Sequence, residues 1–180
     1  MTAFNFELAR RNMIEQQIRP WEVLDQRVLD TLAHAPREDF VPDRYRKLAF
    51  SDVAIPLGHG EVMLKPNVEG RILQALAAQP TDHALEVGTG GGYLTACLAR
   101  LAASVVSVDI VPEFTEIARH KLKAHGVNNV ALHSGDASGG WGERRYNVIA
   151  VTGSVAKVAE VWRRAPLQRH RRHGVGGQGR

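Results

Sequence analysis

The chain has little cysteine and no long apolar run, and both absences limit what it can be. Cys97 is the only cysteine among 180 residues, which excludes an internal disulfide and a cysteine-based metal cluster and favours a reducing, cytoplasmic compartment. No stretch approaches the roughly 18 consecutive apolar residues of a membrane helix, and the first residues lack the basic and apolar segments of a secretory signal. The histidines lack metal-ligand spacing. We therefore expect no membrane partner and no metal site.

Acidic residues are missing from positions 163–180, which hold six arginines. Without these arginines, 17 basic residues stand against 19 acidic ones, so the formal net charge of +4 belongs to this end of the chain. After Pro166 the sequence has few aliphatic residues and no periodicity, and we predict a disordered basic tail over 165–180. A basic tail can contact nucleic acid. Because no aromatic or folded platform accompanies the charge, we expect a solvated end and no nucleic-acid partner.

Residues 1–80 are predicted to form an N-terminal helical region and a substrate loop. Apolar residues recur at helical intervals from Phe6 until Arg19 and Pro20 end the run. Asp25 is a plausible N-cap for a second helix. Breaker residues over 51–66 predict a loop, and a further helix follows and ends near Pro80.

From residue 81 to 164 the pattern changes to alternating strands and helices. This order implies a parallel sheet with helices on both faces, and therefore a Rossmann-like α/β domain. The predicted strands are 83–87, 105–109, 129–133 and 147–151, and the predicted helices are 93–101, 112–124 and 155–164.

The most specific local signal is the segment 86–93 (EVGTGGGY), between a predicted strand and a predicted helix. Glycines let the backbone turn sharply and approach a ligand without obstruction by a Cβ atom. A dinucleotide site uses G-x-G-x-x-G and places a pyrophosphate at the helix N-terminus. Here Gly88, Gly90 and Gly92 are spaced G-x-G-x-G, and an acid, Glu86, precedes them. An acid suits the cationic sulfonium and amino group of S-adenosylmethionine better than a pyrophosphate.

Two further acids follow successive strands. Asp109 ends the second predicted strand, 21 positions after Gly88, where a carboxylate can accept from both ribose hydroxyls; it can equally cap the next helix. Asp136 follows the third strand, where it can accept from an adenine amino group while Ala137 lies against the ring edge; a plain turn is the alternative. Ligands of open parallel sheets bind at the carboxyl edge of the strands, so we predict one cofactor site there.

Taken with these motifs, the sequence resembles the protein-L-isoaspartate O-methyltransferase family. The resemblance covers about residues 10–160. It is carried by 13–18 (MIEQQI), 36–42 (PREDFVP), 50–52 (FSD), 55–58 (IPLG), the glycine loop and Asp136. It implies a class I methyltransferase that uses S-adenosylmethionine to methylate the abnormal carboxylate of isoaspartyl residues in damaged proteins, as protein repair. By analogy, the cofactor would be bound by Glu86, Gly88, Gly90, Asp109 and Asp136.

The resemblance also shows two departures. The family's loop before the third helix carries Gln-Thr-Ile-Ser, whereas this chain has Glu61, Val62, Met63 and Leu64, followed by Lys65. Two hydroxyls that would bind the acceptor are thus replaced by apolar groups, and a neutral amide by a carboxylate. The family also continues with three more strands, so we expect a C-terminally truncated chain, an incomplete parallel sheet and an edge at 148–151.

Three functions follow from these features. The first is isoaspartyl methyltransfer. The second is a donor-binding member of the family without isoaspartyl activity or with a different acceptor, favoured by the altered loop and the lost strands. The third is a dinucleotide-binding oxidoreductase, which the G-x-G-x-G spacing disfavours. The sequence does not indicate an oligomeric state.

Overall fold

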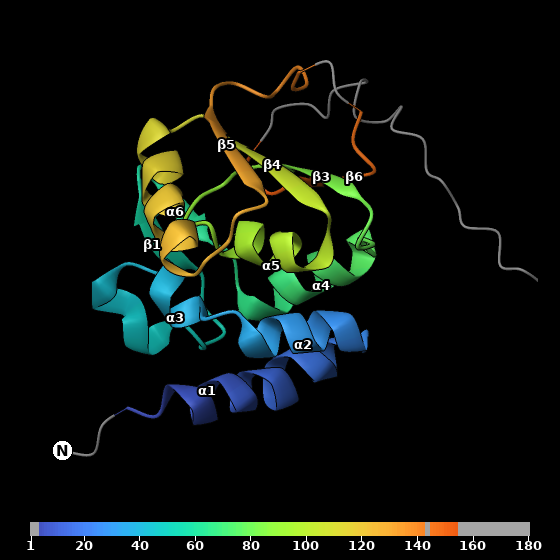
Figure 1. Ribbon diagram of the computed structural model, residues 1–180. Coiled ribbons are helices and arrows are strands. Elements are labelled where there is room, and N and C mark those ends of the chain that lie inside the picture. The colour runs from blue at the N-terminus through green and yellow to red at the C-terminus, as the bar shows by residue number, and fades with distance from the viewer. Residues whose placement is uncertain (1–3, 143–144, 155–180) are drawn as a thin grey trace, which may run out of the picture.

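The computed structural model describes residues 4–142 and 145–154 (Figure 1). The helix predicted over 155–164 and the tail predicted over 165–180 lie outside the described residues. Within the described ranges, no helix combines the length and the apolar character that a membrane crossing requires.

The N-terminal region is helical, as predicted. Helix α1 (Phe6–Met13) begins at Asn5, whose side chain accepts a hydrogen bond from Leu8 N at 2.9 Å. It continues as a π-helical segment, η1 (Ile14–Ile18), and a 3-10 turn, η2 (Arg19–Trp21). Pro20 is tolerated there because the first turn of a helix needs no N–H donor. The helical backbone continues to Trp21, one residue beyond Pro20, where the sequence predicted its end.

Helix α2 (Gln26–His34) begins at the predicted cap. The Asp25 carboxylate accepts from Arg27 N at 2.8 Å and from Val28 N at 3.4 Å, which satisfies donors that have no partner inside the helix. Val28, Leu29 and Leu32 form its buried face.

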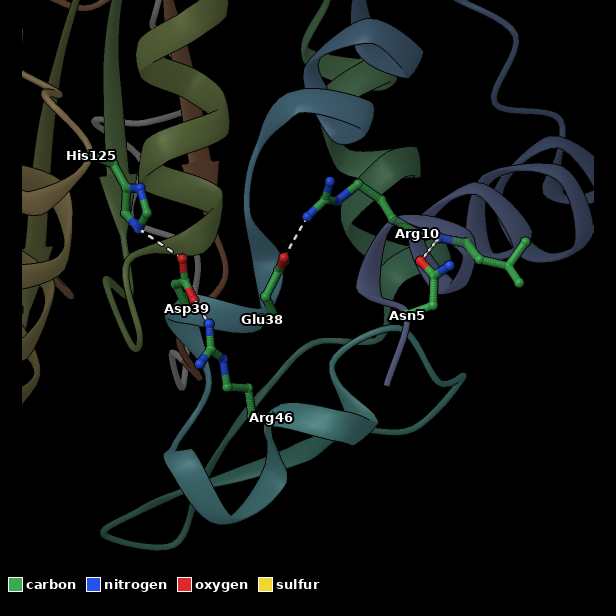
Figure 2. A network of polar contacts seen from close by, with 7 residues as sticks. Asn5, Arg10, Glu38, Asp39, Arg46 and His125 are labelled. Carbon is green, nitrogen blue, oxygen red and sulfur yellow. Dashed lines mark hydrogen bonds and ion pairs between the residues drawn. The ribbon is translucent and has the colours of Figure 1, made fainter. Parts of the chain in front are cut away.

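A short helix, α3 (Arg37–Phe40), links the N-terminal helices to the sheet domain through charged contacts (Figure 2). Arg10 of α1 donates to Glu38 at 2.5 Å. Asp39 contacts Arg46 of η3 (Asp43–Leu48) at 2.5 Å and His125 at 3.3 Å. His125 caps the end of α6 (Pro112–Ala124). The polar face of α3 thus bridges α1 to α6.

The loop prediction for 51–66 was wrong over residues 55–63. Strands β1 (Ile55–Gly58) and β2 (Glu61–Met63) pair as an antiparallel hairpin. Gly58, His59 and Gly60 all have positive φ, and this backbone conformation makes the reversal possible. Helix α4 (Pro66–Leu76) follows, close to its predicted position.

The sheet is parallel and has the order β5-β4-β3-β6, which confirms the predicted Rossmann-like α/β fold. Its elements in chain order are β3 (His83–Val87), α5 (Tyr93–Leu101), β4 (Ser104–Asp109), α6, β5 (Val130–Ser134) and β6 (Val148–Val151). In the described part of the chain, β6 pairs with β3 alone, so its other side is an open edge.

The described residues place helices on one face of the sheet, and because the helix predicted over 155–164 lies outside them, the expectation of helices on both faces stays a prediction. Helices α4, α5 and α6 pack on the same face of the sheet (Figure 1). The reason lies in the strand order, because β3, β4 and β5 advance in one direction and right-handed crossovers then place both connecting helices on one side. On the other face, Ala137, Trp141 and Tyr146 of the β5–β6 connection pack against Leu85, Val87 and Val108.

The main apolar core is continuous across residue 80. It contains Met13 and Leu32 from the N-terminal region, and Ala84 and Leu98 from the sheet and its helices. Helix α2 packs against α4 and α5, and the π-helical segment η1 packs against α4. The division into domains at residue 80 stays a prediction.

Candidate functional site

A pocket opens at the carboxyl ends of the parallel strands. It encloses a cavity of about 170 Å³ and opens to solvent. Its base is the glycine loop after β3 together with the ends of β4, β5 and β6, and the hairpin forms one wall. Eight predicted site residues line it: Glu61, Val62, Leu64, Gly88, Gly90, Asp109, Asp136 and Ala137. Glu86, Gly92 and Lys65 do not.

Two glycines of the loop are required for packing. At Gly88 (φ +106°) a Cβ atom would lie 2.4 Å from Gly153 N, just after β6. At Gly92 (φ +86°) it would lie 2.9 Å from the Cβ atom of Ala118 in α6. The absence of a side chain at Gly88 lets the loop lie directly against the residues after β6. The absence of one at Gly92 lets α5 begin against α6. Gly92 thus shapes the loop without lining the pocket.

Asp109 fixes the loop from the neighbouring strand. Its Oδ2 accepts from Gly90 N and its Oδ1 from Val111 N, both at 2.9 Å. Val111 is the N-cap residue of α6, and α6 has no side-chain cap, so the alternative that Asp109 caps this helix was wrong: its carboxylate holds the turn just before the helix. Asp109 also lines the pocket, and a ligand role is compatible with that contact.

Glu86 lies beneath the glycine loop. Its side chain is fully buried on the helix side of the sheet. Ser107 Oγ donates to Glu86 Oε2 at 2.6 Å, and Thr95 donates to the same oxygen. Burial raises the pKa of Glu86 to about 7. Its contacts bind β3 to β4 and α5, so the structure supports an indirect influence on the pocket through the loop.

Asp136 is exposed at the rim. Its Oδ1 accepts from Ser138 N at 2.8 Å, and this hydrogen bond lowers the pKa of Asp136 below its usual range. The carboxylate is therefore ionised at neutral pH. Ala137 is buried beside it.

Several residues of the pocket were not predicted from the sequence. Ile110 and Phe114 supply apolar surface beyond β4. Thr152 follows β6 and donates from Oγ1 to Gly88 O at 2.9 Å. Glu69 of α4 and Tyr93 of α5 form part of the wall under the hairpin. An apolar residue directly after a strand-end acid was a usable signal for Ile110, and Tyr93 closes the glycine-loop segment 86–93, whereas Glu69 gave no signal.

The charges around the pocket are of one sign. Among the described residues, the lining includes Glu61, Asp109 and Asp136, together with Glu69, whose charge is paired with Arg37, and it includes no lysine, arginine or histidine. Lys65, the last residue of the predicted substrate loop, does not line the pocket and forms an ion pair with Asp52 at 3.6 Å. Such a lining suits a cationic ligand and is unfavourable for a pyrophosphate.

The fold and the strand-edge site define the Rossmann-like class of class I methyltransferases. The model of the protein-L-isoaspartate(D-aspartate) O-methyltransferase family matches residues 8–165. The chain belongs to this family.

Individual relatives agree with this assignment. A protein-L-isoaspartate O-methyltransferase 2 of Anaeromyxobacter is 37% identical over 87% of this chain and 65% of its own length. A protein-L-isoaspartate O-methyltransferase of Myxococcus xanthus is 43% identical over 66% of this chain and 56% of its own length. A solved protein-L-isoaspartate O-methyltransferase superposes with a TM-score of 0.71 at 25% identity, covering 89% of this chain and 52% of that one. The chain thus spans less than two thirds of the length of these proteins.

Proposed function

We propose that the chain transfers a methyl group from S-adenosylmethionine to the abnormal carboxylate of L-isoaspartyl residues in damaged proteins. One observation carries the proposal: a single pocket joins the glycine loop and Asp109 at the sheet edge to the hairpin of the N-terminal region. The sheet edge is suited to a methyl donor, and the hairpin lies where the family resemblance places the acceptor.

The residues present fit the donor. S-adenosylmethionine supplies a methyl group activated by a positively charged sulfur, and the lining carboxylates favour such a charge. Asp109 would accept from the ribose hydroxyls, and Gly88 and Gly90 would let the backbone approach the ligand. Asp136 and Ala137 would contact the adenine. Glu86 would hold the loop from below.

The acceptor needs orientation more than proton transfer. A side-chain carboxyl of this kind has a reference pKa near ~3.9 and is ionised at neutral pH, so no general base is required. Correct orientation can contribute roughly 7–11 kcal/mol to such a reaction. Leu57, Val62 and Leu64 line the pocket on the hairpin side, and their apolar side chains would exclude water from the reacting oxygen.

A second candidate is a family member that binds the donor and has no isoaspartyl activity or a different acceptor. It is favoured by the apolar side chains of Val62 and Leu64 and by the charge of Glu61, which replace the hydrogen-bonding groups of the family's loop. The two candidates share the donor site and differ at the hairpin.

We also propose that the reaction belongs to cytoplasmic protein repair. The single cysteine supports a reducing compartment, and Cys97 is fully buried in α5. Burial raises the pKa of its thiol above the ordinary range, so it has no thiolate for catalysis.

The test is methyl transfer from labelled donor to an isoaspartyl peptide, with the matching aspartyl peptide as control. Calorimetry with S-adenosylhomocysteine runs beside it. Transfer confined to the isoaspartyl peptide supports the proposal. Binding of S-adenosylhomocysteine without transfer supports the second candidate, and absence of binding contradicts both.

A further inference from the structure

Glu61 is a free carboxylate at the rim of the pocket. It is the first residue of β2, directly after the hairpin turn, and its side chain is exposed and lines the pocket. Within the described residues, the side chain of Glu61 has no hydrogen-bond or ion-pair partner. By contrast, Glu113 at the start of α6 pairs with His59 of the same hairpin at 2.7 Å. The charge of Glu61 is therefore available to an incoming molecule.

This charge lies on the hairpin side of the pocket, where the proposed function places the anionic acceptor. The lining of the described pocket offers no cation that could offset it, and Lys65 is paired with Asp52. Two like charges a few ångströms apart repel each other in water, and they repel more strongly near a protein surface. An isoaspartyl carboxylate approaching alone is thus opposed by the hairpin.

A positive charge on the acceptor itself would reverse this effect. A lysine or arginine next to the isoaspartyl residue can place its cation on Glu61 and its aliphatic stem on the neighbouring apolar surface of Leu57 and Val62. The ion pair between Glu61 and this cation would neutralise the charge at the rim and orient the abnormal carboxylate toward the donor. Charge complementarity of this kind acts on association and on the choice of partner.

We infer that Glu61 is a specificity-determining residue that selects isoaspartyl acceptors with a basic residue beside the damaged site. The inference rests on the proposed isoaspartyl activity and adds a substrate class to it.

The experiment compares isoaspartyl peptides that differ in one neighbouring residue, which is lysine, alanine or glutamate. The parent protein should show kcat/KM falling in that order, with about a tenfold spread between lysine and glutamate that shrinks at high salt. Glu61→Gln should reduce the spread to about twofold, and Glu61→Lys should invert the order. Binding of S-adenosylhomocysteine should be unchanged in both variants.

Glu116→Gln is the matched control, because it removes the same charge from an exposed site on α6 where Glu116 pairs with Arg119 at 3.6 Å. It should keep the parent's order. The inference is overturned if the parent and Glu61→Gln rank the three peptides alike with the same spread in kcat/KM, or if the parent shows no preference among them. Either result leaves isoaspartyl activity in place. Failure to methylate any of the peptides overturns the proposed activity, and this inference with it.

Discussion

Arg37 and Glu69 form a buried ion pair that joins the N-terminal region to the wall of the pocket. Both side chains are almost completely buried. Arg37 also donates from Nε to Ala49 O at 2.6 Å and from Nη2 to Leu64 O at 2.7 Å. Its guanidinium lies 4.7 Å from the centre of the Tyr93 ring. One cation thus fixes the backbone of the substrate loop above α4 and α5.

Removing Arg37 should destabilise the fold strongly. Arg37→Met leaves the Glu69 carboxylate buried without its cation, and breaking a buried pair in this way costs about 3–5 kcal/mol. The free energy of unfolding in urea measures the loss. Arg37→Met combined with Glu69→Gln should recover part of it, because the second change removes the unpaired charge.

Arg19→Met is the control for this prediction. Arg19 pairs with Glu15 on the exposed face of the N-terminal helix at 3.2 Å, and such surface pairs contribute about 0–1 kcal/mol. A loss for Arg37→Met no larger than that of the control would show that the pair does not hold the loop.

The buried carboxyl of Glu86 should make stability depend on pH. Burial raises its pKa in the folded chain to about 7, from an ordinary value of 4.5. Between these values the folded chain holds a proton that the unfolded chain has released. The free energy of unfolding therefore falls as pH rises through this window, by up to about 3 kcal/mol.

Glu86→Gln should remove this contribution, because an amide does not ionise. We expect a flatter pH dependence in urea unfolding and greater stability than the parent above pH 7. Some slope should remain, since burial also raises the pKa of Glu69. Glu116→Gln, at an exposed position, should keep the parent's slope. Identical slopes in the parent and in Glu86→Gln would mean that Glu86 is not a source of the dependence.

Asp109→Asn tests the donor site. The change keeps the size of the side chain but removes its charge and one acceptor of a backbone N–H. A hydrogen bond to a charged group contributes about 1.5–3 kcal/mol, so affinity for S-adenosylhomocysteine should fall roughly 10- to 100-fold in calorimetry. Asp30→Asn, an exposed change beside Gln26, should leave the affinity unchanged. Equal affinities in the two variants would remove Asp109 from the proposed ligand contacts.

Sequence patterns were sufficient to predict the parts of the fold that depend on the succession of strands and helices along the chain. Alternation of strands and helices predicted the parallel sheet, and the shared edge of such a sheet brought Gly88, Asp109 and Asp136 to one pocket. The alternation of side chains along β3 also indicates the direction of the Glu86 side chain, which the sequence prediction overlooked. Its neighbours Leu85 and Val87 face the opposite side of β3, so Glu86 had to point toward the helices.

Other features depend on contacts that no local pattern encodes. Strand β2 has only three residues, and β1 contains a proline, so neither shows a usable periodicity. The Arg37–Glu69 pair joins residues 32 positions apart. The face on which the helices lie follows from strand order, which composition and periodicity do not determine.

Restoring the hydroxyls of the substrate loop should raise isoaspartyl activity. Val62→Thr is close to isosteric at a half-exposed position, and Leu64→Ser acts on a residue whose carbonyl is held by Arg37 whatever its side chain. The loop should therefore keep its course while gaining two donors toward the acceptor carboxylate. One preorganised donor can change a rate by roughly 10²–10³, and we expect the double variant to gain at least about tenfold in kcat/KM.

The control for this variant is Val53→Thr, which makes the same chemical change at an exposed valine outside the pocket. It should leave kcat/KM at the parent's value. A double variant that binds S-adenosylhomocysteine normally but gains no isoaspartyl turnover would favour a different acceptor. The apolar wall of Val62 and Leu64 would then be the feature that defines this acceptor, because a pocket without hydroxyls at these positions best accommodates a group that needs no hydrogen bonds there.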